Sequence, residues 1–190
     1  MCSTSTWETG KSEDEPTADS AEGIEAGMSA EFELTVRPVG WVREGASRPG
    51  GETGLEARAS EIEIDAAWAE ALDGIEGFSH VWVVWCFDQA GVPPAALRVH
   101  PEQRAEMPLV GIFATRSPHR PNGLAITAVR LLGRQGARLR VQGLEATQGT
   151  PVLDIKPYLR RGDLIAEASA PDWLERLWEV HDRERAGLEE

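Results

Sequence analysis

The sequence predicts a mainly β protein: a compact barrel or sandwich of short strands with short flanking helices and a C-terminal helix. Several segments alternate apolar and polar residues as half-buried strands do. Turn signals recur about every 8 to 12 residues between these segments, and few segments have helical spacing. Neither a GxGxxG that follows a strand nor a GxxxxGK[ST] occurs, so the familiar dinucleotide and phosphate loops are absent.

Charge is distributed unevenly along the 190 residues, whose formal net charge is −13. Such acidity argues at first against a nucleic-acid partner. Residues 1–30 carry a net −6 and residues 171–190 a net −4. Between 111 and 161, nine lysines and arginines face only Glu145 and Asp154, a net of +7. The middle of the chain is therefore the segment suited to an anionic ligand.

Composition divides the chain into three parts. Residues 1–30 are rich in small and acidic residues and are expected to be a disordered tail, because they bury too little apolar surface to offset ordering entropy. Residues 31–168 form the expected barrel domain, and 169–190 the C-terminal helix. Cys2 and Cys86 do not suggest a disulfide, which favours a reduced, cytoplasmic setting. No apolar stretch is long enough for a membrane span, and the histidines lack metal-ligand spacing, so neither a membrane nor a metal is expected.

The first half of the chain supplies two alternating strands, a short helix and an apolar strand. EFELTVRPVGWV starts the order near Glu31, and after a Gly-rich loop over 43–54 ARASEIEI alternates again, with Ala57, Ala59, Ile62 and Ile64 as its apolar set. Asp65 is a plausible N-cap for the helix AAWAEALDGI. HVWVVWCF is then almost wholly apolar, as in a strand covered on both faces.

The second half predicts strands separated by turns. A long loop with four prolines leads to strands at 109–114, 124–132, 137–145 and 151–155, with RQGAR as a hairpin turn between the second and third. PDWLERLWEVHDRERAG places apolar residues at helical spacing with Pro171 at its first turn, which predicts the C-terminal helix.

The stretch GIFATRSPHRPNG holds the densest set of hydrogen-bond donors. Two prolines forbid a helix here, so the side chains stand on a stiff loop after a predicted strand over 111–114. Arg116 and Arg120 offer planar donor forks, and His119 and Asn122 add hydrogen bonds, which favours an anion or nucleotide site. The alternative is a stiffened surface loop whose arginines pair with nearby carboxylates.

The stretch TPVLDIKPY holds a second set. Strand alternation points Asp154, Lys156 and Tyr158 in one direction, where a carboxylate, an ammonium and a phenol can accept a proton and orient a base. The alternative is an exposed Asp–Lys pair on an edge strand. Where the apolar strand HVWVVWCF ends, Asp88 and Gln89 are well placed to meet a ligand.

Together, GIFATRSPHRPNGLAITAVRL, GTPVLDIKPYL and LDGIEGFSHVWVVWCF resemble the TsaA-like family, also called the TrmO or VirR family, from about residue 32 to 163. Its characterised members are S-adenosylmethionine-dependent methyltransferases that act on N6 of threonylcarbamoyladenosine beside the tRNA anticodon. The resemblance implies a TsaA-like β-barrel, a homodimer, S-adenosylmethionine as cofactor near the subunit interface, and the tRNA anticodon loop as partner.

The resemblance also implies roles for individual residues. The catalytic residues would be Asp154, Lys156 and Tyr158. The substrate contacts would be His119, Arg120, Asn122 and Arg160. The cofactor contacts would be Arg48, Asp88, Gln89, Arg116 and Leu124, with the backbone around Leu144, Glu145, Ala146 and Thr147 cradling the adenosine.

Two segments differ from the family pattern. RPNGLAIT stands where members usually have RPNPIGLS, and SRPGGETGL stands where they carry a PRQ-type motif. These differences favour a rival hypothesis, a non-catalytic regulatory protein that binds S-adenosylmethionine or a nucleotide. The intact LDIKPY favours the enzyme, and a methyltransferase of another small substrate is the third possibility.

Overall fold

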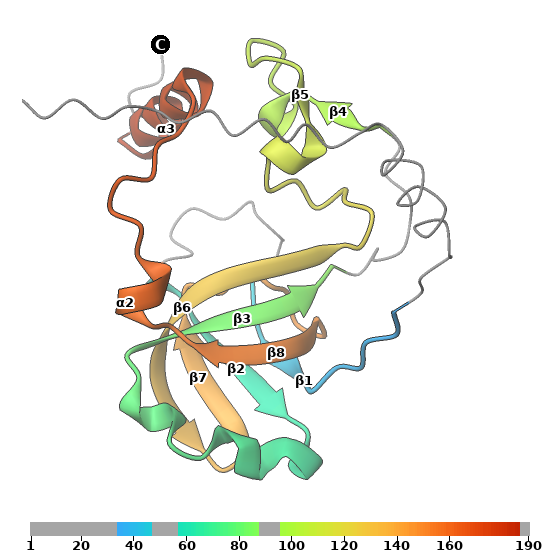
Figure 1. The fold of residues 1–190 in the computed structure, drawn as a ribbon, viewed down its shortest axis with the longest axis vertical. Helices are drawn as coiled ribbons and strands as arrows, with labels where there is room; N and C mark the ends of the chain where they lie inside the picture. The colour runs from blue at the N-terminus through green and yellow to red at the C-terminus, as the bar shows by residue number, and fades with distance from the viewer. Residues whose placement is uncertain (1–33, 47–56, 88–95, 187–190) are drawn as a thin grey trace, which may run out of the picture. The chain divides into compact units, whose positions relative to one another are not determined.

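Six strands close into an antiparallel barrel in the computed structural model, which describes residues 34–46, 57–87 and 96–186 (Figure 1). Neighbouring strands follow the order β1-β2-β7-β6-β3-β8 around the barrel. The strands are β1 (Gly40–Glu44), β2 (Ala59–Ile64), β3 (His80–Cys86), β6 (Leu124–Gln135), β7 (Arg138–Gln142) and β8 (Pro151–Pro157). The predicted β-barrel is therefore confirmed.

The core fills the inside of the barrel with branched apolar side chains. Successive residues of a strand point to opposite faces, so every second residue is buried. The fully buried set includes Val42, Ile62, Val81, Val83, Val129, Leu139, Val141 and Val152, to which all six strands contribute. Because the core lies inside the closed barrel, the outward-facing side chains of each strand are left to contact other elements or a ligand.

The inward-facing residues of β2 differ from the predicted apolar set. Ser60, Ile62 and Ile64 are buried, whereas Ala59 pairs with Gln142 on the outer face. The prediction for Ala59 was wrong because it lies an odd number of positions from Ile62, and only residues two apart share a face of a strand. Ser60 takes the inward position, and its hydroxyl has no hydrogen-bond partner among the described residues.

The first strand is shorter than predicted. The predicted strand began near Glu31, but the described residues from Leu34 to Pro38 are not in a strand, and β1 begins at Gly40. Pro38 cannot donate a backbone hydrogen bond to a ladder, and Val36 is 53% exposed. At Gly40 the paired strand passes so closely that an added Cβ would lie 2.5 Å from the carbonyl oxygen of Glu63.

Short 3₁₀-helices, η3 (Ala66–Leu72) and η4 (Ile75–Gly77), connect β2 to β3. Asp65 caps the first one by accepting a hydrogen bond of 2.9 Å from the Ala67 N–H, as predicted. Arg134 of β6 then ties this connection to the barrel. Its Nη1 lies 2.9 Å from Asp73 and 3.2 Å from Glu76, and these partners raise the pKa of Arg134 above its usual value.

The predicted strand over 109–114 was wrong beyond Gly111. A two-residue strand β5 (Val110–Gly111) pairs with β4 (Arg98–Val99), and the helical turn η6 (Ile112–Ala114) follows; η5 (Pro101–Gln103) lies between β4 and β5. The hydroxyl of Thr115 donates to the carbonyl oxygen of Ile112 at 2.8 Å, and such local hydrogen bonds compete with a strand ladder. The hairpin predicted at RQGAR is confirmed, with Gly136 at a φ of 59°.

The C-terminal segment contains α2 (Arg160–Asp163) and α3 (Asp172–Arg185), with Pro171 as the N-cap of α3. Leu177 is buried on α3, whereas Trp178 is 47% exposed. Near its end, Glu184 accepts a hydrogen bond of 2.6 Å from the guanidinium of Arg104, which follows η5. An ionic contact therefore ties α3 to the segment between β4 and β5.

Acid is expected to remove this contact. The hydrogen bond from Arg104 lowers the pKa of Glu184 below its ordinary value of 4.5. Because the ionised form is favoured in the folded protein, its contribution is complete above that value and is lost as the pH falls through the lower, folded-state pKa. Hydrogen exchange of α3 amides should therefore be faster in Glu184→Gln than in the wild type at pH 7, and the difference should shrink as the pH falls below 4.5.

The matched control for this prediction is Glu179→Gln, which removes an exposed carboxylate of the same helix that makes no side-chain ion pair with the described residues. It should exchange like the wild type at every pH. A difference between Glu184→Gln and the wild type that does not shrink as the pH falls below 4.5 would contradict the expectation.

Candidate functional site

A groove of about 860 Å³ lies along the outer faces of β3 and β6. Residues from the loop over 115–120 and from the end of β7 with the turn that follows also line it. Its lining comprises His80, Trp82, Trp85, Phe87, Thr115, Arg116, Arg120, Leu124, Ala125, Ile126, Thr127, Ala128, Arg130, Gln142, Gly143 and Glu145. Three parts of the chain that are distant in sequence thus meet around one hollow.

The prediction that β3 is covered on both faces was wrong, because its outer face forms a wall of the groove. Val81 and Val83 are fully buried inside the barrel, but Trp82 and Val84 are only half-buried, and His80 is exposed. Apolar residues on the outer face are thus available to a ligand. The continuous apolar run concealed this alternation, because both faces of the strand carry large apolar side chains.

The loop over 115–120 is stiffened by its own side chains. The Nη1 of Arg120 donates to the carbonyl oxygens of Thr115 at 2.8 Å and of Ile112 at 3.3 Å. Its guanidinium also lies 5.5 Å from the centre of the Phe113 ring, which is within cation–π range. In addition, the Thr115 hydroxyl accepts a hydrogen bond of 3.2 Å from the Ser117 N–H.

Arg116 differs from its neighbour because it makes no hydrogen bond or ion pair with any described residue. It is exposed and lines the groove. The alternative that the loop arginines pair with nearby carboxylates is not observed for Arg116 or Arg120 among the described residues. At the end of the loop, Gly123 has a φ of 57°, and its carbonyl oxygen accepts a hydrogen bond of 2.9 Å from the Phe87 N–H.

The predicted catalytic set lies on the strand beside the groove wall. Asp154 pairs in register with Val84 and Lys156 with Trp82, so both side chains share the outer face of the barrel, as predicted. The Nζ of Lys156 lies 2.6 Å from the Asp154 carboxylate. The ring of Tyr158 lies 5.5 Å from that of Trp82, which lines the groove. These side chains flank the groove rather than line it.

The alternative of an exposed Asp–Lys pair on an edge strand is wrong about the strand, which belongs to the closed barrel, but the pair itself is exposed. β8 is hydrogen-bonded to β1 on one side and to β3 on the other, and the barrel is closed. Only Pro151 and Val152 of β8 pair with β1, so at Asp154 and Lys156 the backbone is paired with β3 alone, and the two side chains are 46% and 64% exposed.

The segment over 144–147 offers mostly backbone to a ligand. Leu144 and Ala146 are completely buried in the core. The carbonyl oxygen of Ala146 accepts a hydrogen bond of 2.9 Å from the Ala46 N–H, and the Thr147 hydroxyl lies 3.2 Å from that of Thr150. Of the four predicted cofactor contacts here, only Glu145 lines the groove.

Comparison with known proteins places this geometry in a family. The tRNA-methyltransferase O N-terminal domain matches residues 43–164 of the chain, which is well over half of its length. The chain belongs to the TrmO family. The match contains the stiff loop, the apolar strand and the strand with the Asp–Lys pair. The TrmO resemblance of the three sequence motifs is thereby confirmed.

Individual TrmO-family relatives agree with the assignment. A probable S-adenosyl-L-methionine-binding protein of Pyrococcus abyssi is 36% identical, over 80% of this chain and 82% of that protein. A tRNA (adenine(37)-N6)-methyltransferase of Rattus norvegicus is 38% identical over 62% of this chain and 26% of its own. The crystal structure of TrmO from Pseudomonas aeruginosa superimposes with a TM-score of 0.60 at 30% identity, over 84% of this chain and 79% of the other.

The length of the match varies among relatives. Two RcsF proteins of Pseudomonas aeruginosa are 46% and 40% identical to this chain, but the match covers only 43% and 41% of their own lengths. The chain thus spans less than half the length of these relatives. No helix among the described residues is long and apolar enough to cross a membrane, and no cluster of three or more His, Cys, Asp or Glu there could hold a metal ion.

The other predicted site residues of the TrmO-family barrel fall into two groups. Arg48, Asp88 and Gln89 lie outside the described residues, so their predicted roles stay predictions. His119, Asn122 and Arg160 are exposed but do not line the groove.

The sequence interpretation missed most of the groove lining, including the polar and aromatic side chains of His80, Trp82, Arg130 and Gln142. Their strands were predicted, but the outer faces were not assigned. Strict alternation from the buried Val81 and Val129 would have placed His80, Trp82 and Arg130 on the outer face.

Proposed function

We propose that this TrmO-family protein transfers a methyl group from S-adenosylmethionine to N6 of threonylcarbamoyladenosine beside the tRNA anticodon. The observation that carries the proposal is one groove that combines Arg116, unpaired among the described residues, with an apolar wall, flanked by a carboxylate, an ammonium and a phenol. The rat relative named tRNA (adenine(37)-N6)-methyltransferase supports the choice of reaction, and the Pyrococcus relative supports the cofactor.

The groove has the size and the polar groups that S-adenosylmethionine requires. Its volume of about 860 Å³ lies in the range of small-molecule sites, roughly 300 to 1,000 Å³. The free guanidinium of Arg116 would pair with the cofactor carboxylate, and the exposed Glu145 with its ammonium. Trp82 and Leu124 would cover the adenine ring with apolar surface.

The bound cofactor would supply a methyl group activated by a sulfonium leaving group. The protein would then need to align the substrate amine and accept its proton, and alignment alone supplies a large part of such a rate. Asp154 would accept the proton, and Tyr158 would orient the amine from its position against Trp82. Lys156 would balance the charge of Asp154 and, with Arg160, meet the anionic substrate.

A homodimer is part of this proposal. Leu124 and Ile126 on the outer face of β6 are 47% and 52% exposed, and they border the groove. A second copy packed over this face would bury apolar surface and close the open side of the groove, which would exclude water from the reacting groups.

The second candidate is a protein that binds S-adenosylmethionine without transferring its methyl group. The ion pair of 2.6 Å between Lys156 and Asp154 favours it, since the Lys156 ammonium already occupies the carboxylate that would have to accept the proton of the amine. The shortened RPNGLAIT segment at the end of the stiff loop points the same way.

Calorimetric titration with S-adenosylmethionine tests the cofactor site. Arg116→Ala should weaken binding about ten- to a hundredfold, because losing a charge-assisted hydrogen bond costs roughly 1.5 to 3 kcal/mol. The control is Arg43→Ala, which removes an exposed arginine of β1 that pairs with Glu63 away from the groove and should leave the affinity unchanged. Binding that Arg116→Ala does not weaken would place the cofactor elsewhere.

Transfer of a radiolabelled methyl group then separates the two candidates. The enzyme should label tRNA that carries threonylcarbamoyladenosine and leave tRNA without this modification unlabelled. Tight cofactor binding without labelling would favour the regulatory protein.

A further inference from the structure

The outer face of β7 carries an arginine that the proposed reaction does not use. Arg140 is exposed and makes no hydrogen bond or ion pair with any described residue. Its neighbour on the same face, Arg138, lies 3.2 Å from Glu61 and 3.3 Å from Glu63. The fold thus neutralises one of these two arginines and leaves the other available to an external anion.

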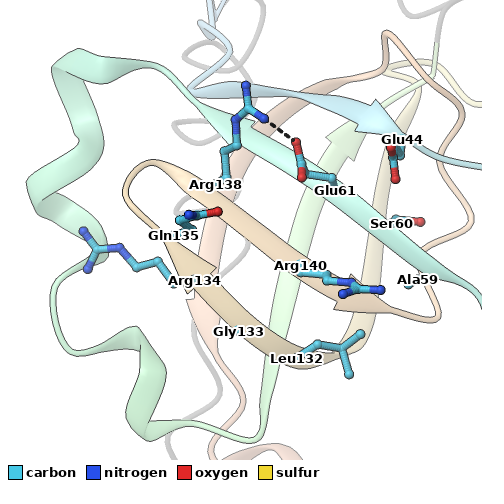
Figure 2. Close-up of a pocket in the computed structure, with 10 residues that line it drawn as sticks. All are labelled: Glu44, Ala59, Ser60, Glu61, Leu132, Gly133, Arg134, Gln135, Arg138 and Arg140. Atoms are coloured by element: carbon cyan, nitrogen blue, oxygen red, sulfur yellow. Dashed lines mark ion pairs between the residues drawn. The ribbon is translucent and has the colours of Figure 1, made fainter.

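Arg140 lines a second, smaller hollow of about 390 Å³ on the outer faces of β2, β6 and β7 (Figure 2). In the close-up the guanidinium of Arg140 extends toward Ala59. Arg138, at the other end of β7, reaches to Glu61 instead. The orientation of Arg140 matters because Ala59 lies at the end of β2 that adjoins the groove.

The pairing of β2, β7 and β6 shows that residues lining the two hollows are neighbours. Ala59 pairs with Gln142, and Gln142 pairs with Arg130 across the next strand. Gln142 and Arg130 both line the larger groove, and Arg140 lies two residues before Gln142 on the same face of β7. Side chains two apart on a strand face are separated by roughly 7 Å. Arg130, Gln142 and Arg140 therefore form a continuous row that begins in the groove.

The charge of this row suits an anion of extended shape. Like Arg140, Arg130 has no ion-pair partner among the described residues. Two carboxylates border the smaller hollow, and one of them, Glu61, is already engaged by Arg138. Guanidinium groups bind phosphate in planar, bidentate geometry, and an amide such as Gln142 between them adds hydrogen bonds.

We infer that Arg130, Gln142 and Arg140 form a phosphate track, which receives the RNA backbone as it leaves the groove and continues over β7. This inference rests on the proposed function, because it takes the nucleotide in the groove to be part of a longer RNA. Phosphate contacts of this kind position a nucleic acid without reading its sequence. The track would account for a basic middle segment in a chain whose net charge is −13.

Anisotropy of fluorescein-labelled tRNA, measured with the full chain over a series of salt concentrations, tests the track. Arg140→Gln removes the charge, and Arg140→Glu reverses it. Since neutralised phosphates release counterions, loss of one contact should lower the slope of log K against log salt by about 0.7 to 0.9. We expect the affinity to fall several-fold in Arg140→Gln and further in Arg140→Glu. Arg43→Gln is the matched control, because it removes an exposed arginine that lines neither hollow.

The salt dependence of tRNA binding either supports or overturns the phosphate track. A reduced slope in both Arg140 variants, with unchanged S-adenosylmethionine titrations and a wild-type slope in Arg43→Gln, supports the track. Wild-type slopes in the Arg140 variants overturn it, even if the protein methylates tRNA. Absence of tRNA binding by the wild type also overturns it and would direct the search to an acidic protein partner, while the cofactor titration independently tests the proposed function.

Discussion

Asp154→Asn is expected to lower the kcat of methyl transfer by about 10²- to 10⁴-fold, the range that a positioned general base contributes. The carboxylate lies 2.6 Å from Lys156 and its backbone is paired in register with Val84 of β3, so the amide should occupy the same place without accepting a proton. Single-turnover assays on threonylcarbamoyladenosine-containing tRNA would measure the rate of the chemical step.

Two further measurements show whether the lower kcat of Asp154→Asn reflects a slower chemical step. S-adenosylmethionine affinity should stay within about twofold of the wild type, because an interaction made only in the transition state changes kcat rather than ligand binding. Asp182→Asn, an exposed carboxylate on α3, is the matched control and should leave the rate unchanged. A rate for Asp154→Asn within a factor of two or three of the wild type would remove Asp154 from the proposed mechanism.

Trp85→Ala is expected to lower the free energy of unfolding by about 3 to 5 kcal/mol, the cost typical of truncating a large aromatic side chain in a core. Trp85 is 3% exposed, its indole N–H donates to the Thr127 hydroxyl at 3.1 Å, and its ring lies 4.7 Å from that of Phe87 in a T-shaped arrangement. The substitution leaves a cavity and also an unpaired hydroxyl. Urea unfolding followed by circular dichroism would measure the difference.

Trp68→Ala is the matched control for this second expectation. Trp68 lies on η3 and is 53% exposed, so its truncation should change the free energy of unfolding by less than about 0.5 kcal/mol. Trp85→Phe should fall between the two, because it keeps most of the ring but loses the hydrogen bond to Thr127. Equal stability of the two alanine variants would mean that Trp85 is not part of the packed core.

The strands were predictable from sequence where one face is apolar and the other polar. β2 and β7 alternate in this way, and their register follows from the alternation. β3 was predictable as a strand but not as a groove wall, because Trp82 and Val84 on its outer face are as apolar as the residues it buries. The pattern of apolar residues alone cannot separate a covered face from a ligand-binding one.

The types of residue in the candidate site were predictable from the sequence, but the different roles of residues of the same type were less so. Arg116 and Arg120 are equivalent in the sequence, and only the folded loop distinguishes them. Arg120 is bonded to loop carbonyls, whereas Arg116 has no partner in the part of the chain that the structure describes. The shared face of Asp154 and Lys156 followed from strand alternation. The proximity of Arg140 to the groove depends on strand order around the barrel, which local sequence does not encode.

The bonds from Arg120 to the carbonyl oxygens of Thr115 and Ile112 have a consequence for binding kinetics. A loop held together by its own guanidinium already has its working shape before any ligand arrives. Little conformational entropy is then lost on binding, and no slow ordering step needs to precede it. Cofactor association should accordingly follow a single exponential whose rate rises linearly with concentration, as expected for capture by a site formed in advance.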